Sequence, residues 1–222
     1  MPFAKLPDLE RRYRLLREAD ADHPVFSVNF HVDLISAFLG ATDAIGTDPY
    51  PYPKDDLGMV ADWTRKTVRG VFGMRPVIMA PQAFDWKDYS KWHGEGFPTR
   101  EAMRNMSFQA VANGANGLVW YAYGAMKKNF RGKPEEFRTH WADVVAVVKE
   151  IKAREPWLLS DEAAPEVDGV KSGISARAFM LGGRLSLLVV NSDKDRAVGE
   201  LAVGAERVSY DLPALGVEWI NK

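Results

Sequence analysis

The chain has 222 residues, of which 46% are hydrophobic and 27% charged, as in a globular protein with one large domain or a medium domain and a small companion. Its 29 Lys and Arg balance 30 Asp and Glu, so no basic excess indicates a nucleic-acid or membrane-surface partner. It contains no cysteine, which excludes disulfides and thiolate metal sites.

The amino-terminal residues include no apolar run of signal-peptide length, and no segment approaches the roughly 18 apolar residues of a membrane-spanning helix. We therefore expect a cytoplasmic protein as the chain stands, or an extracellular or periplasmic one if the chain is truncated. The sequence has no HExxH, GxSxG, P-loop or GxGxxG motif, so we expect no cofactor and no metal.

The first 156 residues alternate between helical and extended patterns. In chain order they predict a helix over 8–20, a strand over 23–30, a short helix from His31 to about Gly40, a brief strand and turn within 44–53, a helix over 57–73, a strand over 75–82, a loop over 83–98, a helix over 100–114, a strand over 117–124 and a helix over 133–155.

Strands that alternate with crossover helices indicate an α/β fold with a parallel sheet, here of four strand–helix units. After Pro156 the pattern changes. Residues 157–172 are typical of a linker, and 173–222 alternate as in an antiparallel, sandwich-like β domain with a hairpin at Gly182 and Gly183.

Polar and aromatic side chains follow each predicted parallel strand, where ligands of α/β folds bind. They are Asn29 and His31 after the first strand, Asp48 and Tyr50 after the second, Gln82, Asp85 and Trp86 after the third, and Trp120 and Tyr121 after the fourth. Amides and carboxylates bind sugar hydroxyls and rings stack on pyranose faces, so this set favours a carbohydrate ligand. The alternative is that the rings pack against the edge of the core.

Glycoside hydrolysis needs two carboxyl groups beside the scissile bond, and Asp48 and Asp85 are the candidates at the strand ends. Each has a structural alternative: Asp48 precedes Pro49 and can form a turn, and Asp85 can cap a loop. His31 has no partner at metal-ligand spacing, so a structural role is favoured over a ligand or base.

Several segments resemble the second half of a glycoside-hydrolase (β/α)8 barrel of the retaining clan that includes families 2, 5 and 42, followed by a β-sandwich. They are DLERRYRLLREADADHPVF, DAIGTDPYPYP, RPVIMAPQAFDW, PTREAMRNMSFQAVANGANGLVWYAYG and the closing β-rich region. The resemblance implies that residues 1–156 hold barrel strands five to eight, that the acid/base Glu of strand four is absent from this chain, and that the nucleophile position falls at or beside Gln82.

Two functions follow from these patterns. One is a glycoside-hydrolase fragment or half-barrel that lacks the usual acid/base and acts on or binds carbohydrate. The other is a non-catalytic carbohydrate-binding or structural remnant, and an unrelated α/β small-molecule protein is least favoured. Because half a barrel leaves two sheet edges unpaired, we expect a homodimer or a complementing amino-terminal half as partner.

Overall fold

The computed structural model describes residues 5–89 and 93–222, so part of the predicted loop over 83–98, including Trp92, lies outside the described residues. The helices are α1 (Leu6–Ala19), η2 (Val32–Ala41), α2 (Met59–Gly70), η3 (Trp86–Asp88), α3 (Arg100–Ala112), α4 (Tyr123–Asn129), α5 (Pro134–Ala153) and α6 (Glu155–Leu158). The strands are β1 (Phe26–Val28), β2 (Ala44–Gly46), β3 (Ile78–Met79), β4 (Gly117–Leu118), β5 (Val167–Asp168), β6 (Ile174–Leu181), β7 (Arg184–Asn191), β8 (Ala197–Val203), β9 (Glu206–Leu212) and β10 (Val217–Asn221).

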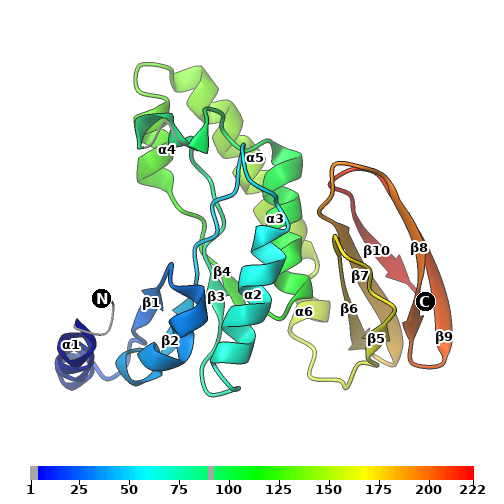
Figure 1. The fold of residues 1–222 in the computed structure, drawn as a ribbon, viewed down its shortest axis with the longest axis horizontal. Helices are drawn as coiled ribbons and strands as arrows, with labels where there is room; N and C mark the ends of the chain where they lie inside the picture. Colours follow the sequence, from blue (N-terminus) through cyan, green and yellow to red (C-terminus); the bar gives the residue numbers. More distant parts are fainter. Residues whose placement is uncertain (1–4, 90–92) are drawn as a thin grey trace.

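Four short parallel strands form an open arc in the amino-terminal part (Figure 1). β1 pairs with β2 and β3 with β4, and a parallel bridge between Ile45 and Val77 joins the two pairs. A Cβ at Gly46 would lie 1.6 Å from the carbonyl oxygen of Ile78, so glycine allows β2 and β3 to approach this closely. The arc does not close: within the described residues, the outer edges of β1 and β4 pair with no further strand.

The hydrophobic core lies between the strands and the helices η2, α2, α3 and α5. It includes Ile45 and Met79 from the strands, Val60 from α2, and Met103 and Met106 from α3, all fully buried. α3 begins at Thr99, whose hydroxyl accepts a hydrogen bond from the amide of Ala102 at 3.2 Å. It is buried along nearly its whole length because the strands cover one side of it and the β domain covers the other.

The predicted strand over 117–124 is shorter in the structure. Regular pairing ends at Leu118, an isolated bridge joins Gln82 to Tyr121, and α4 begins at Tyr123. The sequence favoured a strand because Tyr121 and Tyr123 are β-forming residues. Burial of Ala125, Met126 and Asn129 instead stabilises a helix there. The short helix after His31 is a 3₁₀ helix, η2.

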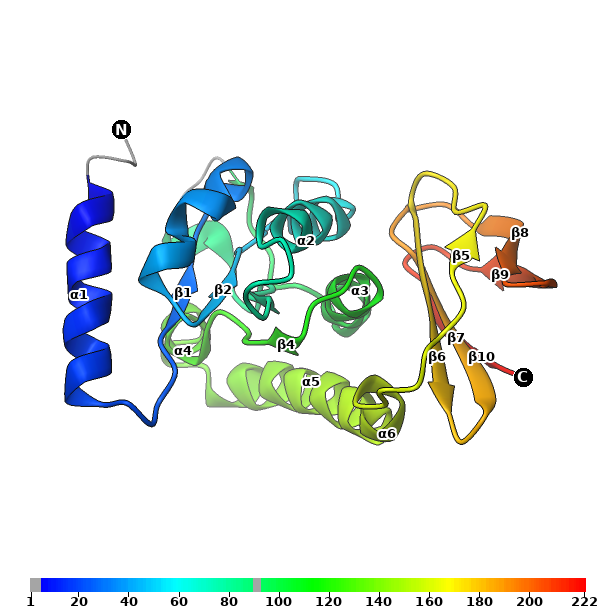
Figure 2. The same cartoon turned by 90° about the horizontal axis from the view of Figure 1, so that it is seen from below.

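The carboxy-terminal residues form two antiparallel sheets of order β10-β7-β6 and β5-β8-β9 (Figures 1 and 2). The predicted hairpin is confirmed: Gly182 and Gly183 join β6 to β7 with φ of 59° and 71°. β5 lies within the predicted linker stretch 157–172 and pairs with β8.

Strand β7 packs on both of its faces. Leu187 and Val189 contact the second sheet, whereas Leu188 and Val190 face Phe108 and Val111 of α3. This explains the unbroken apolar run in β7, since both faces of a covered strand are buried. Among the described residues, no helix has the length and apolar character needed to span a bilayer.

Candidate functional site

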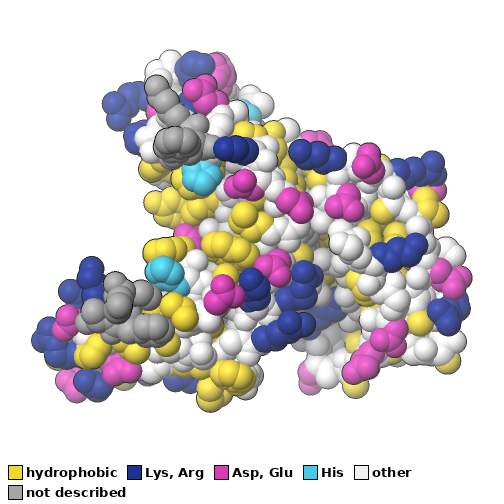
Figure 3. Space-filling view, viewed as in Figure 1, with side chains coloured by type: hydrophobic (Ala, Val, Ile, Leu, Met, Phe, Trp, Pro, Cys, Tyr) yellow, Lys and Arg dark blue, Asp and Glu magenta, His cyan; other side chains and the backbone are white. Residues whose placement is uncertain are grey.

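A cavity of about 380 Å³ opens at the carboxyl ends of the four parallel strands. The residues that line it come from the end of each strand in turn: Val28, the last residue of β1; Asp48 and Tyr50 after β2; Ala80, Phe84, Trp86 and Tyr89 after β3; and Val119, Trp120 and Tyr121 after β4. Figure 3 shows hydrophobic side chains gathered in the hollow between the α4 end and the β1 end of this part. The structure thus brings together five of the nine predicted site residues.

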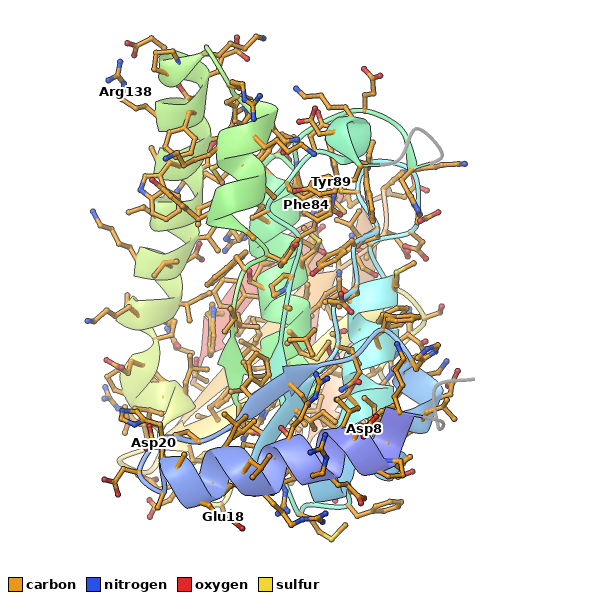
Figure 4. All side chains as sticks on the ribbon, turned by 90° about the vertical axis from the view of Figure 1, so that its left-hand side faces the viewer. Asp8, Glu18, Asp20, Phe84, Tyr89 and Arg138 are labelled. Carbon is orange, nitrogen blue, oxygen red and sulfur yellow. The ribbon has the colours of Figure 1, made fainter. Side chains whose placement is uncertain are left out.

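Aromatic rings from three strand ends form one connected cluster, which we call the aromatic wall: Tyr50, Phe84, Trp86, Tyr89 and Tyr121. Phe84 lies at its centre, edge-on to Tyr50 at 5.1 Å, Trp86 at 4.9 Å and Tyr121 at 5.8 Å between ring centroids. Phe84 and Tyr89, 5.4 Å apart, are labelled in Figure 4. Phe84 is only 2% exposed, so it supports the other rings, while Tyr121 is 46% exposed and available to a ligand.

Asp48 is the carboxylate of the cavity, within the described residues. Burial raises the pKa of Asp48, against a smaller lowering effect of its hydrogen bonds with its own backbone and Tyr50. Burial also raises the pKa of Tyr50, reinforced by the neighbouring Asp48 charge. The Oδ1 atom of Asp48 is buried and has no hydrogen-bond partner within residues 5–89 and 93–222. Asp48 therefore presents an unused acceptor in a partly desolvated position.

The buried indole Nε1 of Trp120 likewise has no hydrogen-bond partner in the part of the chain that the structure describes. Trp86 is different: its Nε1 donates to the carbonyl oxygen of Tyr50 at 3.3 Å, and its ring stacks on His93 at 4.2 Å. Trp86 therefore lines the cavity and also ties the aromatic wall to the loop after β2.

Gln82 lies behind the aromatic wall and does not line the cavity. It is fully buried, and its amide is hydrogen-bonded to the backbone. Oε1 accepts from the amide of Tyr52 at 2.9 Å, and Nε2 donates to the carbonyl oxygens of Tyr52 at 2.9 Å and Phe84 at 3.0 Å. Neither N–H of the side chain remains for a ligand.

Asp85 caps η3, since its Oδ1 accepts a hydrogen bond from the amide of Lys87 at 2.9 Å. Asn129 of α4 brackets the Asp85 backbone: Oδ1 accepts from its amide at 2.8 Å and Nδ2 donates to its carbonyl at 3.0 Å. Asp85 is 5% exposed and does not line the cavity. These contacts match the loop-cap alternative.

Asn29 and His31 also lie outside the cavity lining. The backbone amide of Asn29 donates to the carbonyl oxygen of Gly46, while its buried side-chain Nδ2 has no partner among the described residues. The ring of His31 packs on Phe30 at 3.9 Å at the start of η2. Across residues 5–89 and 93–222, no three His, Asp or Glu side chains are grouped closely enough to hold a metal ion.

The other residues that line the cavity were not among the predicted site residues: Val28, Ala80, Phe84, Tyr89 and Val119. Tyr89 follows η3, and the turn of that short helix brings it back against Phe84. The cluster of rings after the third strand was a signal for Tyr89. Val28 and Val119 carried no such signal, because an apolar residue beside a strand reads as core.

The sequence matches no protein-family model and no curated protein. Two similar solved structures are the ligand-free cyclic alpha-maltosyl-(1→6)-maltose hydrolase from Arthrobacter globiformis and Amy13B from Eubacterium rectale. The first has a TM-score of 0.55 and 11% identity over 96% of this chain and 52% of its own. The second has a TM-score of 0.56 and 11% identity over 99% of this chain and 56% of its own.

The chain therefore spans about half the length of the solved structures it matches. At this identity the likeness concerns the fold alone. The fold is similar to that of glycoside hydrolases over about half of their length.

Proposed function

We propose that this chain is the carboxy-terminal part of a glycoside-hydrolase-type protein and that it binds carbohydrate in the cavity at the strand ends. In this proposal residues 1–156 are barrel strands five to eight with their helices, 157–172 connect, and 173–222 form the β domain. Membership of the clan with families 2, 5 and 42 stays a prediction.

One observation carries the proposal: Asp48 and Trp120, which line the same cavity as the aromatic wall, each have a buried polar atom without a partner among the described residues. Sugar rings present an apolar face for stacking and hydroxyl groups that both donate and accept. A carbohydrate bound there would cover the exposed ring surface and bring hydroxyl groups beside Asp48 and Trp120.

Binding without hydrolysis is the activity we propose for this chain by itself. Hydrolysis of a glycosidic bond needs a second carboxyl group beside the first. Among the described residues, Asp48 is the sole carboxylate of the cavity, and Asp85 is committed to capping η3. A second carboxyl group would have to come from additional strand–helix units.

We further propose that such units complete the open arc beside β1 and β4. α1 precedes β1 and lies beyond it in Figure 2, with no buried residue along its length. In a barrel each strand is followed by one covering helix. If a second copy closed the arc beside β1, its α5 would need the place that α1 occupies. This conflict favours a complementing amino-terminal half over a homodimer.

Light scattering during size-exclusion chromatography tests this closure. We expect the chain alone to associate as its concentration rises. The outer edges of β1 and β4 pair with no described strand, and Leu15 and Leu16 of α1 are exposed to water. A defined two-fold dimer would favour closure by a second copy. A stable monomer at high concentration would contradict both kinds of closure.

A glycan array followed by titration calorimetry tests sugar binding. Trp86→Ala should weaken binding of any sugar found by roughly twofold to tenfold, because a stacking ring contributes about 0.5–1.5 kcal/mol. Trp141→Ala is the matched control, since Trp141 is a partly exposed tryptophan of α5 outside the cavity. Absence of sugar binding, or equal losses in both variants, would contradict the proposed site.

Aryl-glycoside assays separate the two functions. We expect no turnover by the chain alone. Turnover that is lost in Asp48→Asn and retained in Asp85→Asn would show instead that this chain is catalytic by itself.

A further inference from the structure

The side chain of Gln82 is hydrogen-bonded to the backbone of two segments that carry rings of the aromatic wall. Its Oε1 accepts a hydrogen bond from the amide of Tyr52, and its Nε2 donates to the carbonyl oxygens of Tyr52 and Phe84, all at 2.9 to 3.0 Å. One fully buried side chain thus joins the loop after β2 to the segment after β3. Both segments carry rings of the wall, Tyr50 and Phe84, which meet edge-on at 5.1 Å.

The backbone of the same residue is tied to the fourth strand end. Gln82 forms an isolated parallel bridge with Tyr121, and the amide of the next residue, Ala83, donates to the carbonyl oxygen of Tyr121 at 2.7 Å. Three rings of the wall therefore depend on the position of Gln82, although none of its polar atoms reaches the cavity.

We propose that Gln82 is a positioning residue: its amide fixes the segments that hold Tyr50 and Phe84, and its side chain does not touch the ligand. The three hydrogen bonds of the Gln82 side chain, which we call the clamp, are a property of the protein without ligand. Their consequence for carbohydrate binding rests on the proposed function. The clamp also means that the position at or beside which the family resemblance places a nucleophile is closed to the cavity.

The pattern of partners explains why an amide is needed. The surroundings offer one N–H and two carbonyl oxygens, so the side chain must accept one hydrogen bond and donate two. Glutamine does both at once. An ionised glutamate would accept from Tyr52 but direct its charge at two carbonyl oxygens, with no solvent to screen it. Only a protonated carboxyl group could donate to one of those oxygens.

The test uses Gln82→Glu and Gln82→Leu, with Gln109→Glu as the matched control. Gln109 is an equally buried amide that accepts from the Ala61 amide at 3.0 Å and donates to Asn105 at 2.7 Å, away from the wall. Hydrogen exchange of the Tyr52 amide and near-ultraviolet circular dichroism of the rings are measured without ligand. Chemical denaturation is followed between pH 4 and 8.

We expect Gln82→Leu to speed exchange at Tyr52 by at least tenfold at every pH and to change the ring spectrum. Gln82→Glu should stay close to the original protein at pH 4, near the unfolded glutamate pKa of about 4.3, and diverge from it as the pH rises. The folded state holds the proton more tightly, so its stability falls with rising pH. Gln109→Glu should also lose stability but leave Tyr52 exchange and the ring spectrum unchanged.

Two results would overturn the proposal. One is unchanged Tyr52 exchange and ring spectrum in Gln82→Leu, whether or not sugar is bound; loss of sugar binding in the same variant would in addition place the amide on the ligand. The other is covalent labelling at position 82 of Gln82→Glu by 2,4-dinitrophenyl 2-deoxy-2-fluoro-β-D-glucoside, a trap for glycosidase nucleophiles. Failure of the unmodified protein to bind any sugar would refute the proposed function but leave the clamp to be judged on the ligand-free measurements.

Discussion

The ring of Tyr50 stacks on the ring of Tyr121, with centroids 5.7 Å apart and planes inclined by 29°. These residues follow β2 and β4, so their contact crosses the end of β3. Phe84 from that third strand end stands nearly perpendicular to both rings, at 87° and 85°. The three strand ends are therefore held together by ring packing where strand pairing has stopped.

Loss of the central ring should destabilise the fold. We expect Phe84→Ala to lower the free energy of unfolding by about 3–5 kcal/mol, because it removes a fully packed aromatic side chain. Phe72→Ala is the control, since Phe72 is 71% exposed and its loss should change stability by no more than about 0.5 kcal/mol. Urea denaturation followed by far-ultraviolet circular dichroism measures both. Equal effects would show that Phe84 does not hold the wall together.

The unpartnered indole of Trp120 predicts a separation of stability from binding. Trp120→Phe keeps a ring but removes a buried donor that has no protein acceptor, so stability should change by less than about 1 kcal/mol. Sugar affinity should fall about fivefold to tenfold, as for one hydrogen bond lost. Trp219→Phe is the control, because Trp219 of β10 also has an Nε1 without a partner among the described residues but packs against Phe108 of α3, away from the cavity. Calorimetric titration should show unchanged affinity in that variant.

The desolvated carboxyl group of Asp48 predicts a pH-dependent stability. Burial raises its pKa in the folded protein above the unfolded value of about 3.9, so the folded state binds the proton more tightly. The stabilisation that comes from this tighter proton binding is complete below the unfolded pKa of Asp48 and is lost as the pH rises through its folded pKa. Asp48→Asn should remove this loss and be the more stable protein at pH 7, by about 1.4 kcal/mol per unit of pKa elevation.

Urea denaturation at several pH values between 3.5 and 7 measures the Asp48 effect. Asp161→Asn, at an exposed position, serves as the control for the change in net charge. Parallel stability curves for Asp48→Asn and the original protein would contradict a raised pKa.

A buried amide joins the two parts of the chain. Nδ2 of Asn105 in α3 donates to the carbonyl oxygens of Asn191 at 2.8 Å and Leu215 at 3.0 Å. Asn105→Leu should lower stability by about 2–4 kcal/mol, because two carbonyl oxygens lose their donor and Gln109 loses an acceptor. Hydrogen exchange should show faster opening at Asn191 and Leu215 first. A uniform increase across the chain would argue against a local joint.

The longer helices could be predicted because each carries its own signals. Thr99 caps α3 as its sequence suggests, and the prediction over 133–155 matches α5 closely. α4 was missed because its start, Tyr123, belongs to a β-favouring run and its helical form depends on burial of Met126 and Asn129 in the assembled fold. Tertiary packing overrides local preference there.

The site was predictable in location more than in detail. The ends of parallel strands point to one edge, so Asp48, Tyr50, Trp86, Trp120 and Tyr121 could be grouped from the order of the elements. The role of Gln82 could not, because its partner Tyr52 lies 30 residues away along the chain. Likewise, Asp85 is fixed by Asn129 of the unpredicted α4, 44 residues away.

The two-sided burial of β7 sets a limit on where the chain can be cut. Leu188 and Val190 cover Phe108 and Val111, so a polypeptide ending near residue 172 would leave that side of α3 in water. The opposite side of α3 packs on the core through Met103 and Met106. Proteolysis between the two parts should therefore yield fragments that stay associated, and the first 156 residues expressed alone should be poorly soluble. The β domain therefore shields from water the apolar face of α3 that points away from the parallel strands.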